Sequence, residues 1–132
     1  MASGILLVTH AGIAHALMDA ARHVLGKLPT ELDSVEIAAD SDPEQALQEA
    51  ARHAASLDNG EGVLVLSDLY GATPCNIARR LSEQSAHLRW VAGLNLSMLL
   101  RVLNSAGRPL DELAEIAVSG GHTGIRIDHA GS

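Results

Sequence analysis

VLVLSDLYGATP, residues 63–74, gives the clearest indication of the fold. Its first four residues form an unbroken apolar run, which is typical of a strand covered on both faces, as in a parallel sheet between helices. Polar and small residues follow, and Thr73-Pro74 then has the cap-and-proline pattern of a helix start. The stretch therefore predicts a buried strand, a short loop and a helix.

The same alternation continues on either side of this stretch. A second continuous apolar run lies at residues 5–8, and weaker strand candidates lie at residues 35–39 and 88–93. Apolar residues at helical spacing predict helices from residue 13 to an end at Gly26, from the Asp42 cap to residue 57, from residue 73 through residue 81, at 96–103 and at 109–118. Residues 124–128 alternate between apolar and polar side chains, as in an exposed or partner-paired strand.

This order of elements is β-α-β-α-β-α-β-α-α-β. It predicts an α/β fold of three layers, with a mostly parallel open sheet, right-handed crossovers and helices on both faces. The 132 residues fit a single domain, residues 1–132. The hydrophobic fraction is 47% but the aromatic fraction only 2%, so Ala, Val, Leu and Ile must form the core.

Composition also excludes several classes of function. The net charge of −7 and the absence of a basic patch argue against nucleic acid as a partner. The single cysteine, Cys75, cannot form an internal disulfide, and no His, Cys and Asp set has the spacing of a metal site. No signal-peptide pattern or membrane-spanning run occurs, so we expect a soluble cytoplasmic protein without membrane insertion.

Polar residues stand at the predicted strand ends. The first strand ends in Thr9-His10 and the third in Ser67-Asp68, while Asp40 and Asn95 follow the second and fourth. Ligands of open parallel sheets bind at this edge. If strands one and three are neighbours, Asp68 can orient the His10 ring through one nitrogen and leave the other free for attack.

The loop before the third helix is a candidate anion site. Gly71, Ala72 and Thr73 precede or begin the helix, where unpaired backbone N–H groups bind anions. Taken alone, such a loop is more often an ordinary strand-to-helix turn than an anion site. It is not a Walker loop, since it lacks the Gly-Lys-Ser/Thr pattern.

Three blocks together resemble the signature segments of the mannose-family (mannose/fructose/sorbose) IIA components of the phosphoenolpyruvate-dependent sugar phosphotransferase system. They are residues 4–12 (GILLVTHAG), 67–76 (SDLYGATPCN) and 92–100 (AGLNLSMLL), in the family's order and spacing. The sequence departs from the family pattern at Ala72, Cys75 and Ser97, which leaves the identity of the partner open.

The resemblance implies a phosphoryl carrier without a cofactor. His10 would accept the phosphoryl group from the carrier protein HPr and pass it to a IIB component, and Asp68 would orient its ring. Tyr70 would lie in the docking surface, and Thr73 near the phosphoryl group. It also implies a homodimer that exchanges a C-terminal antiparallel strand, matched here by residues 124–128.

Two alternatives remain open on the sequence. One is a phosphotransfer subunit that serves dihydroxyacetone kinase, and the other is a regulatory protein-binding module switched by phosphorylation of His10. Neither the sugar nor the choice between transport and regulation can be inferred. Among the other histidines, His15 is expected to be a solvated or half-buried helix residue, and His122 to lie in a glycine-rich link before the last strand.

Overall fold

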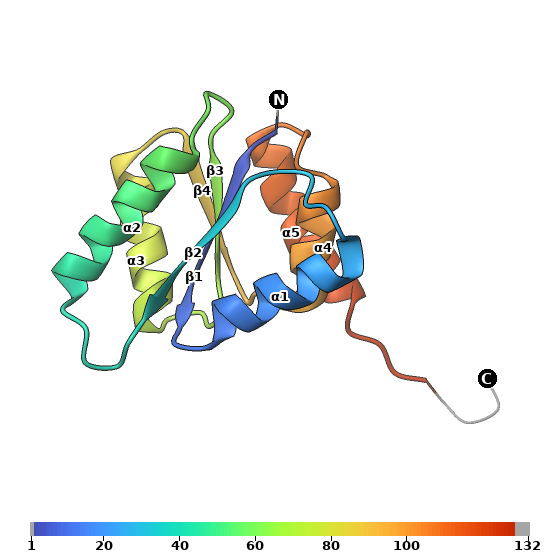
Figure 1. Cartoon of the computed structure of the whole chain (residues 1–132), viewed down its shortest axis with the longest axis horizontal. Coiled ribbons are helices and arrows are strands. Elements are labelled where there is room, and N and C mark those ends of the chain that lie inside the picture. The colour runs from blue at the N-terminus through green and yellow to red at the C-terminus, as the bar shows by residue number, and fades with distance from the viewer. Residues whose placement is uncertain (1, 129–132) are drawn as a thin grey trace.

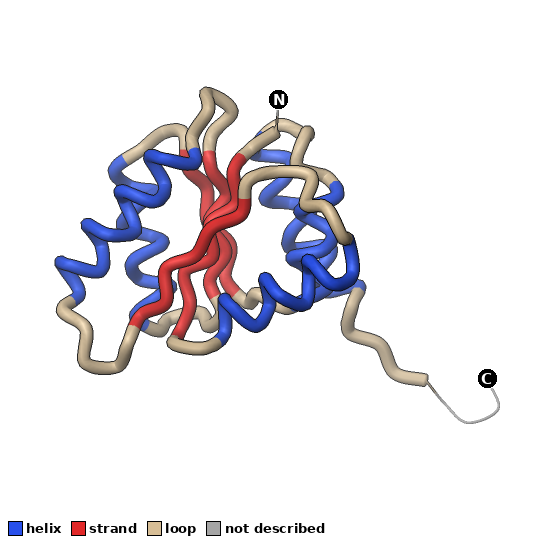
Figure 2. Tube along the Cα trace, viewed as in Figure 1, coloured by secondary structure: helices blue, strands red, loops and turns tan. Residues whose placement is uncertain are grey.

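The computed structural model describes residues 2–128 and confirms the predicted α/β fold. Within these residues the strands are β1 (Gly4–His10), β2 (Leu32–Ile37), β3 (Val63–Ser67) and β4 (Leu88–Ala92). The helices are α1 (Ile13–Leu25), α2 (Pro43–Leu57), α3 (Thr73–Gln84), α4 (Leu96–Asn104) and α5 (Leu110–Thr123). Figures 1 and 2 show the sheet running through the middle of the molecule, with helices on either side.

The sheet has the strand order β2-β1-β3-β4, and all its described pairs are parallel. Strands β1 and β3 are therefore neighbours, which is the condition for His10 and Asp68 to meet. In the register, Val8 lies opposite Ser67 on one side, and Thr9 lies opposite Glu36 on the other. The carboxyl ends of these three strands thus form one edge.

Helices α1, α4 and α5 cover one face of the sheet, and α2 and α3 cover the other (Figure 1). Alternate residues of β1 serve the two faces: Ile5 and Leu7 pack toward the first group of helices, and Leu6 and Val8 toward the second. All four side chains are fully buried. The two cores are almost wholly aliphatic, as the composition predicts.

The C-terminal part differs from the sequence prediction. The glycine-rich segment expected to be a link is helical, because α5 continues to Thr123. A Cβ atom at Gly120 would lie 2.7 Å from the Cβ of Arg101, and one at Gly121 would lie 3.0 Å from the Cε of Met98. These glycines therefore allow α5 to approach α4 closely. In the sequence alone, the same glycines indicate a turn.

Residues 125–128 form no strand in the structure of the single chain. They extend from the body of the molecule after α5, as Figure 1 shows. The predicted exchange of this segment requires a second copy and stays a prediction. His129 lies outside the described residues.

The helix boundaries largely follow the predicted caps. The Gly26 N–H donates to the Arg22 carbonyl at the end of α1, and the Asp42 carboxylate accepts from the Glu44 N–H at the start of α2. The cap of α3 is Ala72 and not Thr73, which is already the first helical residue. None of the helices described between residues 2 and 128 is long and apolar enough to cross a membrane.

Candidate functional site

His10 and Asp68 meet at the carboxyl edge of the sheet. The Nδ1 atom of His10 lies 2.7 Å from Oδ2 of Asp68, and the backbone N–H of His10 donates to the same oxygen over 3.1 Å. The Asp68 side chain is only 8% exposed, whereas that of His10 is 45% exposed. One carboxylate oxygen thus fixes both the backbone and the ring of the histidine.

This pairing determines which ring nitrogen is reactive. An ionised carboxylate can only accept hydrogen bonds, so the Nδ1 atom of His10 carries the proton in this contact. The Nε2 atom then holds a free lone pair on the half-exposed ring. An oriented neutral imidazole with one accessible nitrogen is suited to nucleophilic attack.

Two buried oxygens beside this pair stand without hydrogen-bond partners in the described part of the chain. They are Oδ1 of Asp68 and Oγ of Ser67. Such atoms are disfavoured in a folded protein, and they occur more often at functional sites than elsewhere. One oxygen of the Asp68 carboxylate is therefore bonded by His10, and the other is unpaired within the described residues.

The loop after Asp68 leads directly into α3. Gly71 has a φ of 86°, a conformation that side-chain-bearing residues rarely adopt. The Ala72 N–H donates to the Leu69 carbonyl over 3.3 Å, so the predicted Ala72 amide is already engaged within the turn. The amides of Gly71 and Thr73 have no described partner, and α3 has no side-chain cap within residues 2–128. Its amino end is therefore open to an anion.

Tyr70 projects from the same loop and is 78% exposed. Its ring stacks on that of Trp90 in β4, with centroids 6.4 Å apart and planes 14° from parallel. Leu69 beside it is 58% exposed. The sequence pointed to Tyr70 but not to its support by Trp90, because the two residues are distant along the chain.

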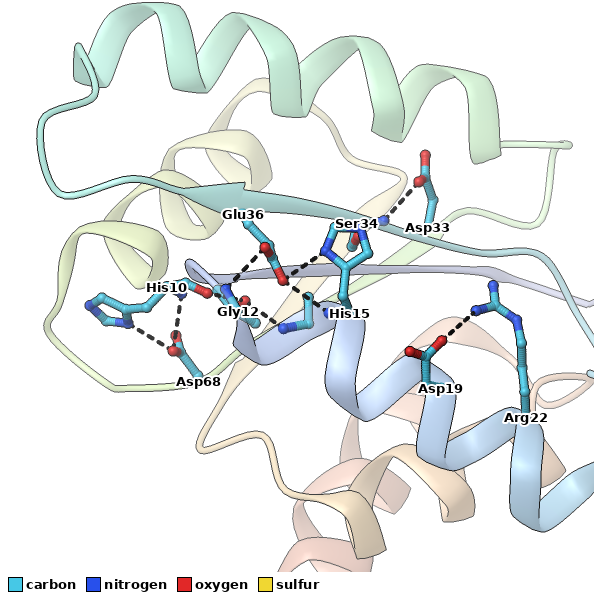
Figure 3. A network of polar contacts seen from close by, with 11 residues as sticks. His10, Gly12, His15, Asp19, Arg22, Asp33, Ser34, Glu36 and Asp68 are labelled. Atoms are coloured by element: carbon cyan, nitrogen blue, oxygen red, sulfur yellow. Dashed lines mark hydrogen bonds and ion pairs between the residues drawn. The ribbon is translucent and has the colours of Figure 1, made fainter.

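A second carboxylate, that of Glu36, bonds the turn between His10 and the start of α1. It accepts from the Gly12 N–H over 3.0 Å and from the His15 N–H over 3.0 Å, and its Oε2 lies 2.9 Å from Nδ1 of His15. Figure 3 shows Glu36 above the start of α1, while the His10 ring points away from that helix. The amides of His15 and Gly12, in this order, hold the pKa of Glu36 below its usual range.

Sequence reasoning missed Glu36, although a signal for it existed. No Ser, Thr, Asp or Asn stands at positions 11 and 12, just before α1, so the helix has no local cap residue. Its first amides therefore require an acceptor from elsewhere. Glu36 supplies one from β2, and the Thr9 hydroxyl, which accepts from the Ala14 N–H over 3.1 Å, supplies another.

The remaining candidates lie apart from the pair. Asp40 is exposed beyond the end of β2. Asn95 caps α4 by accepting from the Met98 N–H, and Cys75 is a buried core residue. His122 lies in the last turn of α5 beside a hollow of about 150 Å³ near Asn95. Among residues 2–128 no group of three His, Cys, Asp or Glu side chains could hold a metal ion.

Comparison with known proteins shows the family of the chain. Residues 4–118 match the family model EIIA-man, described as PTS system fructose IIA component. The mannose-specific EIIAB component of the phosphotransferase system of Escherichia coli strain K12 is 29% identical over 128 residues. The match covers 96% of this chain but 39% of that protein, so the chain spans well under half the length of this relative.

Solved structures share the fold along the whole chain. The mannose/sorbose-specific IIA subunit of the phosphotransferase system from Enterococcus faecalis has a TM-score of 0.89 and 27% identity, covering 100% of this chain and 98% of that one. The phosphotransferase system component EIIA from Streptococcus agalactiae has a TM-score of 0.82 and 23% identity, covering 94% and 95%. The second likeness shows the fold alone.

Proposed function

The chain belongs to the EIIA-man family of phosphotransferase-system IIA components, and we propose that it works as a phosphoryl carrier through a phosphohistidine at His10. The observation that carries the proposal is the contact between Nδ1 of His10 and Oδ2 of Asp68, which leaves Nε2 exposed at the carboxyl edge of the sheet. His10 is the nucleophile in this proposal, and Asp68 is the residue that orients it.

The transfer exchanges one P–N bond for another. Nε2 of His10 attacks the phosphorus atom of a phosphohistidine on the donor, a P–N bond to His10 forms, and the P–N bond to the donor's imidazole breaks. The proton on Nδ1 of His10 stays in the hydrogen bond to Asp68, whose negative charge balances the positive charge that develops on the ring. Such a transfer depends on in-line approach and electrostatic positioning.

The phosphoryl oxygens are bound, in this proposal, at the amino end of α3. The open amides of Gly71 and Thr73 and the Thr73 hydroxyl are the available donors, and Ala72 contributes as the residue that shapes the turn. The positive end of the helix dipole favours the doubly charged group.

The partners follow from the family. HPr is the proposed phosphoryl donor and a IIB component the proposed acceptor. Exposed Tyr70 and Leu69, backed by Trp90, form the proposed docking surface beside His10. Aromatic and aliphatic side chains of this kind commonly anchor protein interfaces.

A homodimer is also part of the proposal. Ile125 and Ile127 are 76% and 80% exposed on the segment after α5, and β4 is an edge strand with one unpaired side in the described sheet. A second copy could cover the isoleucines and pair with such an edge. Sedimentation of the wild type and of a variant with Ile125→Asp and Ile127→Asp tests this: the wild type should sediment as a dimer and the variant as a monomer.

Mass spectrometry tests the carrier function directly. The purified protein is incubated with phosphoenolpyruvate, Enzyme I and HPr, and its intact mass is recorded with and without HPr. We expect one phosphoryl adduct that requires HPr and is lost in acid, as phosphohistidine is. Absence of an adduct with components from the same organism would refute the proposed donor, and an acid-stable adduct would refute the phosphohistidine.

A further inference from the structure

Two helices begin close to the His10–Asp68 pair, and their amino ends differ. Helix α1 starts just after His10, and α3 starts at the end of the loop that follows Asp68. Each amino end presents unpaired N–H groups and a partial positive charge that attract an anion. A phosphoryl group on His10 would therefore have two helix amino ends at which it could bind.

The N–H groups at the amino end of α1 already have acceptors within the chain. Glu36 accepts from the N–H groups of Gly12 and His15, and the Thr9 hydroxyl accepts from that of Ala14. The Glu36 side chain is only 18% exposed, and its carboxylate brings a full negative charge to the helix end. An approaching anion would meet both occupied donors and repulsion.

The amino end of α3 shows the opposite state. Its cap residue is Ala72, which has no side-chain acceptor, and Thr73 is exposed. In Figure 3 the His10 ring points away from the start of α1. The direction of the His10 ring and the free N–H groups of α3 thus both favour the amino end of α3 over that of α1.

We propose that Glu36 is a positioning residue that closes the amino end of α1 and thereby directs the phosphoryl group on His10 to the amino end of α3. This inference rests on the proposed carrier function and deepens it. The described hydrogen bonds and ion pairs of Glu36 go to Gly12 and His15 and not to His10. Glu36 acts from β2, where it lies opposite Thr9 in the register, by bonding the turn that follows His10.

The role goes beyond that of an ordinary helix cap, and Asp42 provides the matched comparison. Asp42 caps α2 by accepting from the Glu44 N–H and is exposed, and it accepts no N–H of the turn that follows His10. Removing either carboxylate should lower stability by a similar amount. Only removal of Glu36 should change where the phosphoryl group binds.

The decisive measurement uses a small phosphoryl donor, so that it does not depend on any partner protein. Wild type, Glu36→Gln and Asp42→Ala are phosphorylated at histidine with phosphoramidate, and the backbone amide shifts of each protein are compared before and after. In the wild type and in Asp42→Ala we expect large shifts at Gly71 and Thr73 and small ones at His15. In Glu36→Gln the shift at His15 should grow to a size comparable with that at Thr73.

Kinetics with the protein donor gives a second readout. For Glu36→Gln we expect an unchanged KM for phospho-HPr and a kcat lowered roughly tenfold, within the loss that misplacement of about 1 Å can cause. Asp42→Ala should retain both constants. If HPr phosphorylates none of the proteins, the carrier proposal fails, while the amide shifts still decide the role of Glu36.

The inference is overturned if phosphorylation of the wild type shifts the His15 amide as much as those of Gly71 and Thr73. It is equally overturned if Glu36→Gln retains the wild-type pattern of shifts. The first outcome requires no variant, so the test holds even if Glu36→Gln folds poorly.

Discussion

The molecule contains two histidine–aspartate pairs with almost the same contact distance. Nδ1 of His10 lies 2.7 Å from Oδ2 of Asp68, and Nδ1 of His53 lies 2.6 Å from Oδ2 of Asp33. The first pair stands at the carboxyl ends of the strands. The second joins α2 to β2 near the opposite edge, because Asp33 is the second residue of its strand.

The surroundings separate the two pairs. Asp68 is 8% exposed and also binds the His10 backbone, whereas Asp33 is 42% exposed. Nε2 of His10 is available on a half-exposed ring, but Nε2 of His53 faces Oε1 of Glu49 at 3.9 Å. The comparison teaches that a short His–Asp distance does not by itself identify a nucleophile. In the proposed function, His10 differs from His53 by its fixed carboxylate, its free second nitrogen and its place beside the open amino end of α3.

The largest expected effect is on the histidines themselves. His10→Gln should abolish the HPr-dependent phosphoryl adduct, because the attacking atom is gone, while His53→Gln should retain it at the wild-type rate. Intact-mass measurement over time gives both results. An adduct that persists in His10→Gln and disappears in His53→Gln would reverse the assignment of the two pairs.

The next effect concerns the aspartates. Asp68→Asn should slow phosphorylation by roughly 10²- to 10⁴-fold, because a neutral amide neither selects the reactive tautomer nor balances charge on the ring. Its melting temperature should not fall, since a buried carboxylate with one unpartnered oxygen is replaced by a neutral group. Asp33→Asn should leave the phosphorylation rate unchanged. Equal rates for wild type and Asp68→Asn would remove Asp68 from the mechanism.

The sequence sufficed for the His10–Asp68 pair because both of its signals are local. Each strand is an unbroken apolar run that ends in a polar residue, and a parallel sheet brings such ends to one edge. The condition that remained, adjacency of the first and third strands, was met by the strand order.

Other features were beyond the sequence because they depend on tertiary contacts. Gly120 and Gly121 lie inside α5, where closeness to Arg101 and Met98 outweighs the usual preference of glycine for turns. The missing local cap before α1 indicates an acceptor from elsewhere, but sequence rules for caps consider only neighbouring residues and do not identify Glu36 on β2 as that acceptor. Contacts of this kind must be seen in three dimensions.

A smaller effect is expected when a glycine at either edge of the sheet is replaced by alanine. Gly71 and Gly60 both have positive φ and open space where a Cβ would lie. Substitution of either by Ala should therefore lower the free energy of unfolding by about 1 kcal/mol through backbone strain alone. Only Gly71→Ala should also slow phosphorylation, since it alters the loop beside His10. Urea unfolding and the HPr-dependent assay measure the two effects, and equal loss of phosphorylation in both variants would mean that the loop has no special role.

The smallest expected effect is on how folding stability depends on pH and salt. It compares a carboxylate bonded by backbone amides with one bonded by a side chain. Glu36 is bonded by the N–H groups of His15 and Gly12, and Glu44 pairs with the Arg80 side chain on the surface; each contact lowers the pKa of its carboxyl group. A lowered pKa stabilises the fold above the unfolded-state value of about 4.3, and this stability is lost as the pH falls through the folded-state pKa. At neutral pH Glu36→Gln should thus be less stable than wild type by about 1 kcal/mol, and the difference should shrink below about pH 4.

Salt at about 1 M should suppress the contribution of the exposed Glu44–Arg80 pair and leave most of that of Glu36, because mobile ions screen exposed charges far better than hydrogen bonds to backbone amides. Urea unfolding of Glu36→Gln and Glu44→Gln at two pH values and two salt concentrations measures these differences. A Glu36 contribution that disappears in salt would show that this carboxylate is held no more firmly than a surface ion pair.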